Sequence, residues 1–379
     1  YYFVGNNNYN WNDSNAWRVG SCGGSIDGYP SSNDNVYFTC GDNSRFVTLN
    51  GDAACASLTI DKYEQKLNLA NYNLTVGGDV AIKSQHSSIY SSAGTSNTLH
   101  IGGNLSLEKE NTKIEAPNHT IIIDGNLSLS GGPSRIESAK SISVGGNLTI
   151  SGNNDSYVKS TGNISVLGNV SLTQQKAMIR CANLDITNNL TLSANECNVE
   201  TTGSISCATM TLSGQGTRVK GTTTTITGDL TISGGNNSYV QPSGDMFING
   251  NVRLTEQNVE IKMSSYNLTI GGTFENTTND VKGITWTTGT VSIHGDITVI
   301  SNNATVCPFN CSCTGWLELT GGISQKFTTN NNISIKRFRQ SNTGFTKAGD
   351  RTLTISNTFD RNCGPEPTIN AGIFSVTGE

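Results

Sequence analysis

Short runs in which apolar and polar residues alternate recur along most of the chain. The phrase reads Gly-Asn-Leu-Ser-Leu at 103–107 and 125–129, and Gly-Asn-Leu-Thr-Ile at 146–150. Variants of it begin 20 to 25 residues apart between Gly78 and Gly250, and a further copy begins at Gly295. Alternation of this kind is the period of a β-strand with one buried face. Its regular return indicates a repeat architecture.

Each repeat holds two further runs with the same alternation. Ser-Arg-Ile-Glu-Ser at 134–138 and Ser-Ile-Ser-Val at 141–144 are examples. Between the runs stand Gly-Gly, Asn-Gly, Gly-Asp and Gly-Asn, which suit the tight corners of a chain. Three short strands and three corners in about 21 to 22 residues predict one coil of an all-β parallel β-helix, or β-solenoid. Each coil should lie ~4.8 Å from the next, which supplies its hydrogen-bond partners.

The two ends of the chain differ from the middle. Residues 1–60 carry Trp11, Trp17 and denser aromatics, which predicts an N-terminal cap over the first coil, with sugar stacking by the two Trp rings as the alternative. Residues 61–300 hold the regular solenoid, and residues 301–379 form Cys-containing coils that run on with an uncapped end. An uncapped end exposes strand edges that can pair with another chain. We expect head-to-tail self-association into a fibre, and a removed C-terminal module is the alternative.

Charge and hydropathy exclude some classes of function. Among 379 residues only 14% are charged, and the net charge is -5, which argues against a nucleic-acid partner. No apolar run is long enough to predict a membrane-spanning helix. The chain opens at Tyr1, so we expect a secreted product whose signal peptide has been removed, an artificial start being the alternative.

Ten cysteines bear on the cellular compartment. Their even number predicts disulfides in an oxidising environment. A zinc site around Cys307-x3-Cys311-x-Cys313 is the alternative, although the spacing is poor for zinc, and we expect no cofactor. Cys207 replaces an inward aliphatic residue and is expected to be a buried thiol. The disulfide candidates are Cys22, Cys40, Cys55, Cys181, Cys197, Cys307, Cys311, Cys313 and Cys363.

The opening of the chain also resembles a known group of proteins. It reads Tyr-Tyr-Phe-Val-Gly at 1–5, Trp-Asn-Asp-Ser-Asn-Ala-Trp at 11–17 and Pro-Ser-Ser-Asn-Asp-Asn-Val-Tyr-Phe at 30–38, before Gly-Asn-Leu-Thr-Ile-type repeats. This order is similar to that of secreted bacterial, Bacteroidetes-like surface repeat proteins. The repeat style is also similar to the passengers of autotransporter and filamentous-haemagglutinin adhesins. The resemblance implies display at the cell surface or release, with adhesion or matrix building as the role.

Charged residues on the second strand of each repeat should align, one per coil. These are Glu137, Lys159, Arg180, Glu200 and Lys220, and their signs predict cross-strand pairs on a solvated face. A glycan-binding strip is the alternative. The sequence shows no catalytic constellation: His86, His100, His119 and His294 occupy unrelated phases of the repeat. Corner residues Asp79, Asp229, Asp245 and Asp296 could hold Ca²⁺, but Asn usually stands at their phase, so we expect no metal.

Asn-x-Ser/Thr sequons fall into two groups. One group shares a corner phase, and there we expect an amide ladder rather than glycans, because stacked amides bond to one another: Asn104, Asn126, Asn147, Asn169 and Asn189. The other group lies off this phase and provides the candidates for N-glycosylation: Asn12, Asn118, Asn154, Asn236, Asn276, Asn303 and Asn310.

Together these features predict a non-enzymatic, structural or adhesive protein located outside the cell or at its surface. Its expected partners are other copies of itself, joined head to tail, and cell-surface glycans. The alternative is a glycan-binding or glycan-cleaving β-helix, similar to a polysaccharide lyase.

Overall fold

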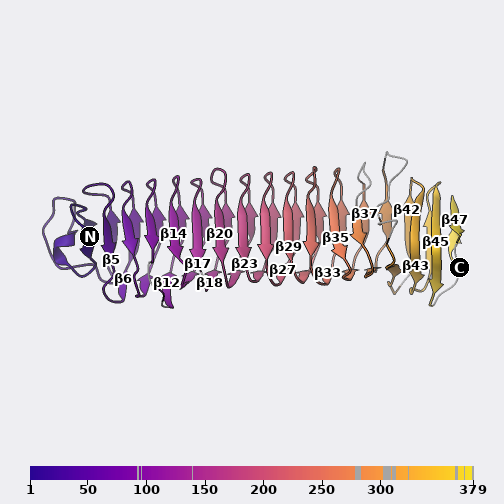
Figure 1. Cartoon of the computed structure of the whole chain (residues 1–379), viewed down its shortest axis with the longest axis horizontal. Coiled ribbons are helices and arrows are strands. Elements are labelled where there is room, and N and C mark those ends of the chain that lie inside the picture. The colour runs from indigo at the N-terminus through magenta and orange to yellow at the C-terminus, as the bar shows by residue number, and fades with distance from the viewer. Residues whose placement is uncertain are drawn as a thin grey trace. The chain divides into compact units, whose positions relative to one another are not determined.

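A computed structural model of the chain shows an all-β parallel β-solenoid with three strands in each regular coil, as the sequence predicts (Figure 1). The structure describes residues 1–377 apart from 92–93, 95, 139, 278–282, 302–308, 310–312, 323, 363–365 and 371. The chain forms two compact units, Tyr1–Asn188 (unit 1) and Asn189–Glu379 (unit 2). Each is described by itself.

In unit 1 the first, second and third strands of successive coils build sheets A, B and C. Sheet A contains β1 (Tyr2–Phe3), β3 (Trp17–Arg18), β4 (Asn35–Phe38), β7 (Ser57–Ile60), β10 (Val80–Ile82), β13 (Leu105–Leu107), β16 (Leu127–Leu129), β19 (Leu148–Ile150) and β22 (Val170–Leu172). Sheet B contains β2 (Tyr9–Asn10), β5 (Phe46–Thr48), β8 (Lys66–Asn68), β11 (Ser88–Tyr90), β14 (Lys113–Ala116), β17 (Arg135–Ser138), β20 (Tyr157–Ser160) and β23 (Met178–Cys181). Sheet C contains β6 (Ala53–Cys55), β9 (Leu74–Val76), β12 (Asn97–Ile101), β15 (His119–Ile123), β18 (Ser141–Val144), β21 (Asn163–Val166) and β24 (Leu184–Ile186).

The hydrophobic pattern sets the register between coils. In sheet A, Leu127 lies opposite Leu148, and in sheet C Ile142 lies opposite Ile164, each in a parallel pair. These four side chains are fully buried. A slip by one residue would turn every aliphatic side chain outward, so burial fixes the pairing. The interior of each regular coil is therefore a stack of like aliphatic side chains, and the residues between them face solvent.

Glycine is needed at the corner that begins the repeated phrase. A Cβ atom on Gly125 would lie 2.7 Å from the carbonyl oxygen of Gly103 in the preceding coil. A Cβ on Gly146 would lie 2.5 Å from Oδ1 of Asn126. Real Cβ atoms do not approach other atoms so closely, and the corner stacks tightly only because the side chain is missing.

Aromatic side chains fill the beginning of unit 1. A short 3-10 helix, η1 (Ser14–Ala16), precedes β3, which pairs with β1 in the antiparallel sense and places Phe3 opposite Trp17. Trp17 is fully buried, Trp11 is 4% exposed, and the Trp17 ring lies 6.0 Å from that of Phe38 in β4. The two indoles are core residues, so their rings are not available for stacking on a sugar.

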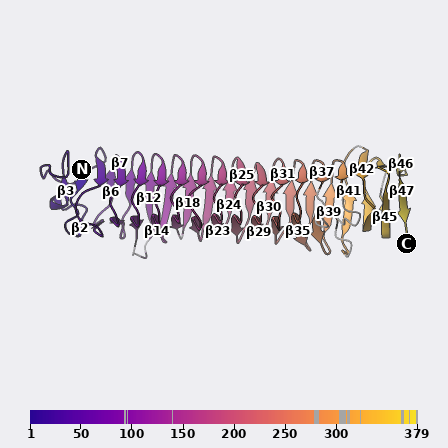
Figure 2. The same ribbon diagram turned by 90° about the horizontal axis from the view of Figure 1, so that it is seen from above.

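Unit 2 repeats the three-sheet arrangement (Figure 2). Sheet A contains β25 (Asn189–Leu192), β28 (Thr209–Leu212), β31 (Leu230–Ile232), β34 (Val252–Leu254), β37 (Phe274–Asn276), β40 (Ile297–Val299), β42 (Gln325–Thr329), β44 (Phe345–Ala348) and β46 (Thr368–Ile369). Sheet B contains β26 (Asn198–Thr201), β29 (Arg218–Gly221), β32 (Tyr239–Pro242), β35 (Glu260–Ser264) and β38 (Ile284–Trp286). Sheet C contains β27 (Ile205–Cys207), β30 (Thr224–Ile226), β33 (Met246–Ile248), β36 (Leu268–Ile270), β39 (Thr290–Ile293), β41 (Trp316–Leu319), β43 (Ile333–Gln340), β45 (Thr352–Arg361) and β47 (Ile373–Val376).

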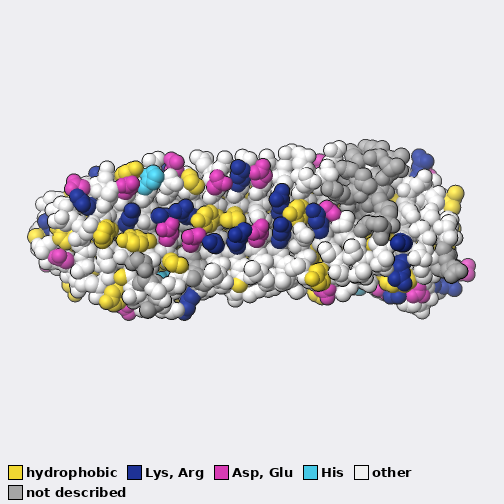
Figure 3. All heavy atoms as spheres, in the orientation of Figure 1, with side chains coloured by type: hydrophobic (Ala, Val, Ile, Leu, Met, Phe, Trp, Pro, Cys, Tyr) yellow, Lys and Arg dark blue, Asp and Glu magenta, His cyan; other side chains and the backbone are white. Residues whose placement is uncertain are grey.

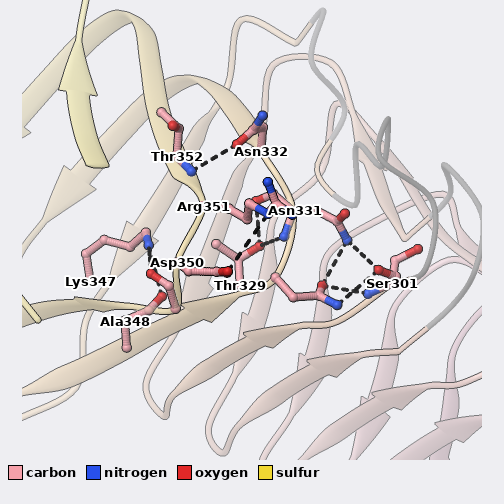
Figure 4. A network of polar contacts seen from close by, with 11 residues as sticks. Ser301, Thr329, Asn331, Asn332, Lys347, Ala348, Asp350, Arg351 and Thr352 are labelled. Carbon is pink, nitrogen blue, oxygen red and sulfur yellow. Dashed lines mark hydrogen bonds and ion pairs between the residues drawn. The ribbon is translucent and has the colours of Figure 1, made fainter. Parts of the chain in front are cut away.

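The last strands of sheet C keep the predicted period. Leu353 of β45 pairs with Ile333 of β43 and with Phe374 of β47, all in parallel. Their interior is different from that of the earlier coils, because polar side chains take inward positions. In sheet A, Lys347 follows Phe327 in the register, is fully buried, and donates to the carbonyl oxygens of Ala348 at 3.0 Å and Gly349 at 2.7 Å (Figure 4).

Candidate functional site

The outward face of sheet B carries most of the aligned charges. In unit 1, Glu137 lies opposite Lys159, which in turn lies opposite Arg180. The Lys159 ammonium is 3.3 Å from the Glu137 carboxylate, so the predicted cross-strand pair is confirmed. In unit 2, Glu200 lies opposite Lys220 in the same way. Figure 3 shows Lys and Arg side chains, in dark blue, interspersed with Asp and Glu side chains, in magenta.

One carboxylate on this face, that of Glu115, forms ion pairs with two cationic side chains. It lies 2.9 Å from Nζ of Lys113 and 3.1 Å from Nη2 of Arg135. Burial opposes ionisation of Glu115, but the hydrogen bonds and charges of Lys113 and Arg135 outweigh it and hold its pKa below the ordinary value. The carboxylate is therefore ionised at neutral pH and keeps both cations in fixed positions.

The predicted amide ladder is present in unit 1. Oδ1 of Asn104 accepts the backbone N–H of Asn126 at 2.9 Å and its Nδ2–H at 3.0 Å. Asn126 accepts from Asn147 in the same manner, and Asn147 accepts from Asn169. Every oxygen accepts from the coil that follows, so the ladder has a direction. These amides are occupied by one another, as expected for the ladder sequons.

The corner aspartates stand at the first position of such ladders. Oδ1 of Asp79 accepts the N–H of Asn104 at 2.7 Å, and Oδ1 of Asp229 accepts that of Asn251 at 2.7 Å. Asp245 and Asp296 likewise accept from Asn267 and Lys326. The first residue of a ladder accepts a hydrogen bond from the next coil and has no earlier ladder residue to which it must donate. An ionised carboxylate, which can only accept hydrogen bonds, therefore suits this position. The described residues contain no group of three His, Cys, Asp or Glu side chains that could hold a metal ion.

The structure forms one disulfide among the cysteines that it describes, between Cys22 and Cys40. Cys55, Cys181, Cys207 and Cys313 are free buried thiols, and Cys197 is also buried. The disulfides expected at Cys55, Cys181 and Cys313 are therefore not formed. In unit 1, Cys55 and Cys181 lie several coils apart, and at ~4.8 Å per coil they are beyond disulfide reach. Three disulfide candidates lie outside the described residues: Cys307, Cys311 and Cys363.

Burial also makes these thiols unreactive. It raises the pKa of the Cys55, Cys181 and Cys207 thiols to about 12, and Cys207 is 3% exposed, the environment expected for it. Since the thiolate is the reactive form, these cysteines behave as small apolar core residues.

The glycosylation candidates lie in different surroundings. Asn12, Asn154 and Asn236 are exposed, and Asn118 is half-buried. Asn276 is 1% exposed and faces inward, because it takes the register position between Leu254 and Val299 in sheet A. A glycan cannot be accommodated there in the folded state. Asn303 and Asn310 lie outside the described residues.

The histidines are placed separately, as expected from their phases. Nε2 of His100 lies 3.0 Å from Oδ2 of Asp124, and the ring of His86 packs on that of Tyr63 at 5.4 Å. His119 is fully buried, and burial lowers its pKa, whereas His294 belongs to unit 2. The described residues contain no helix that is both long and apolar enough to cross a membrane.

Comparisons of the chain with protein-family models, with curated proteins and with solved structures gave no match. The fold and the surfaces described above therefore rest on the chain's own geometry. That geometry offers two surfaces for a functional role, the outward face of sheet B and the strand edges of the last coil in unit 2.

Proposed function

We propose that this protein is a non-catalytic, extracellular structural or adhesive subunit, which associates with further copies of itself head to tail through its strand edges. The last coil of unit 2 is the observation that carries the proposal. Among the described residues, β47 pairs on one side, with β45, and β46 pairs with β44. Ile373 is 61% exposed, Ile369 is 48% exposed and Val376 is 43% exposed. Apolar strand edges of this kind are templates for pairing with another strand.

The beginning of unit 1 supports a contact in which two copies of the chain meet through different surfaces. There β3 runs antiparallel to β1, and the side chains of Phe3, Trp17 and Phe38 are fully buried. The covered surface of unit 1 and the apolar edge of unit 2 are different, so a contact between unit 1 of one copy and unit 2 of another copy is heterologous. Heterologous contacts that do not close build filaments.

Two further observations fit an extracellular, non-catalytic role. The disulfide between Cys22 and Cys40 is the kind of bond that persists in oxidising compartments. On the outward face of sheet B, Glu115 and Glu137 are bonded to cations of their own sheet. Lys113 and Arg135 hold the pKa of Glu115 below its ordinary value, so this carboxylate is a poor general acid at neutral pH.

A matched pair of substitutions tests the assembly. Ile373→Lys places a charge on the β47 edge, and Leu167→Lys makes the same change at a residue of unit 1 that is also 61% exposed. We expect wild type and Leu167→Lys to form end-to-end filaments at high concentration, and Ile373→Lys to remain as single molecules, because edge lysines prevent strand pairing. Light scattering and negative-stain imaging provide the measurement. Filaments of equal length for all three proteins, or single molecules for all three, would sink the proposal.

A further inference from the structure

A hollow of about 200 Å³ lies beside sheet B in unit 1, where β8, β11, β14 and β17 begin. Cationic side chains form much of its lining: Lys66, Lys113 and Arg135, together with the ring of His86. The carboxylate of Glu64 lines it too, and accepts a hydrogen bond from the Ser44 hydroxyl. These residues come from four successive coils of one unit.

The three cationic side chains that line the hollow occupy one position in the register of sheet B. In the register of sheet B, Ser88 lies between Lys66 and Lys113, and Lys113 is followed by Arg135. All four are the first residues of their strands. Three coils therefore present a long cation at this position, and the fourth carries Ser88, which is 1% exposed and does not line the hollow.

The cationic side chains around the hollow outnumber the acidic ones. Lys113 and Arg135 share the one carboxylate of Glu115, which fixes their positions. Lys66 forms no ion pair with any residue that the structure describes. His86 lies in the corner before β11 with a φ of 60°. Its ring packs on that of Tyr63, a residue that is 39% exposed. Glu64 offsets part of this charge, so Lys66, Lys113 and Arg135 outnumber the two acids.

We propose that this hollow binds the anionic group, a carboxylate or a sulfate, of an acidic polysaccharide. Its volume suits one such group rather than a whole oligosaccharide, so the rest of the sugar chain would lie on the open outward face of sheet B. Tyr90, in β11 of the same sheet, is half-buried. The ~4.8 Å step between coils is comparable with the length of one pyranose in an extended polysaccharide.

Charge complementarity favours a saccharide over a nucleic acid. The whole chain has a net charge of -5, and the cations of the hollow are confined to four coils. Nucleic-acid binding needs phosphate contacts along an extended basic surface. A confined pocket with fixed cations instead suits anions that are separated along a polymer. The proposal is independent of end-to-end assembly, because the hollow lies within one unit of one chain.

Removing a cation that lines the hollow gives the sharpest test. Binding of the full chain to heparin and to polygalacturonate would be measured by biolayer interferometry at low and physiological salt, with dextran and duplex DNA as comparison polymers. Binding in the hollow makes the loss depend on which lysine is removed, whereas diffuse electrostatic attraction would make two equal changes of net charge equivalent.

A matched pair of lysines provides the control. Lys66→Gln removes a cation of the hollow, and Lys220→Gln removes one from the same sheet face in unit 2, with the same change of net charge. We expect roughly tenfold weaker binding for Lys66→Gln, the loss of a charge-assisted contact, and no change for Lys220→Gln. Preference for heparin or for polygalacturonate would identify sulfate or carboxylate as the anion. Equal losses in both variants, DNA binding as tight as polysaccharide binding, or no binding of either polysaccharide at low salt would overturn the proposal, provided that circular dichroism shows each variant folded.

Discussion

The regular coils of unit 1 and the last coils of unit 2 fill the same kind of interior in different ways. Between β13 and β22, the inward residues of sheet A are Leu, Ile or Val, all fully buried. In the last coils of unit 2, Gln325, Asn331 and Lys347 are buried at 0 to 6% exposure. The strand period is kept in both regions, so the solenoid fold does not require an aliphatic residue at every inward position.

Hydrogen bonds replace aliphatic packing where the interior is polar. Nε2 of Gln325 donates to the carbonyl oxygens of Ile293 at 2.8 Å and Gly295 at 2.6 Å, and its Oε1 accepts the N–H of Gly321 at 3.0 Å. Nδ2 of Asn331 donates to the Ser301 carbonyl at 2.9 Å (Figure 4). Most buried polar side chains in proteins are hydrogen-bonded, because burying an unbonded polar group costs free energy. The comparison teaches that unit 1 depends on packing volume, and the end of unit 2 on specific bonds.

The largest effect is expected from removing volume in unit 1. Ile121→Ala empties a fully buried position of β15 and should lower the free energy of unfolding by about 2–5 kcal/mol. Its neighbour Ile122 is only half-buried, because it points outward, so Ile122→Ala is the control and should have a much smaller effect. Urea denaturation followed by circular dichroism measures both. Equal losses would show that the aliphatic stack is not what stabilises these coils.

A smaller effect is expected from removing bonds at the end of unit 2. Gln325→Leu keeps the volume but leaves the Gly321 N–H and two carbonyl groups without their partner, which should cost about 1–3 kcal/mol. Lys326→Leu at the exposed neighbouring position is the control and should be close to neutral. Hydrogen exchange would locate the effect in the last coils. An unchanged or stabilised Gln325→Leu protein would show that aliphatic packing serves equally well there.

The amide ladder of unit 1 should contribute less than either core. Asn126→Ala removes an oxygen that accepts two hydrogen bonds from Asn147 and should cost about 1 kcal/mol. Asp79→Asn keeps an accepting oxygen at the foot of the ladder, so its effect should be smaller still. Thermal unfolding compares the two variants. A larger loss for Asp79→Asn would contradict the one-way ladder.

The smallest effect is expected from pH. The folded pKa of Glu115 lies below its ordinary value of 4.5, so the unfolded chain binds the proton more readily. The stability that Glu115 contributes is therefore present above pH 4.5 and is lost as the pH falls through the lower folded pKa. Asp52 behaves alike, because the backbone N–H and side chain of Asn73 lower its pKa. Unfolding measured between neutral and acid pH should show a smaller acid loss in Glu115→Gln than in wild type; an identical pH dependence would contradict the assignment.

Much of this architecture could be predicted from the sequence, because it is periodic. The inward triplets of sheet A, the aligned charges such as Glu137 and Lys159, and the Asn104–Asn126–Asn147 ladder all follow from counting one coil at a time. The role of the aspartates that begin the ladders could also have been predicted, because Asp79 is followed one coil later by Asn104. The sequence does not show that each Asn donates its hydrogen bonds to the preceding coil.

Other features depended on contacts between side chains of different length. The sequence placed Asn276 among the loop sequons, yet its register with Leu254 turns it into the core. It offered nine disulfide candidates, and the structure joins Cys22 to Cys40 while Cys55 and Cys181 remain coils apart. The hollow of unit 1 brings together Lys66, Lys113 and Arg135, which come from different coils and lie far apart along the chain.

The sequence by itself thus determined the winding, since alternation and corner residues are local properties that every coil repeats. The tertiary structure sets which outward side chains meet, which inward polar groups are hydrogen-bonded, and where a hollow forms. The physical reason is that coils differ in length by several residues, so the neighbours of a side chain come from the register of the strands and cannot be counted along the chain alone.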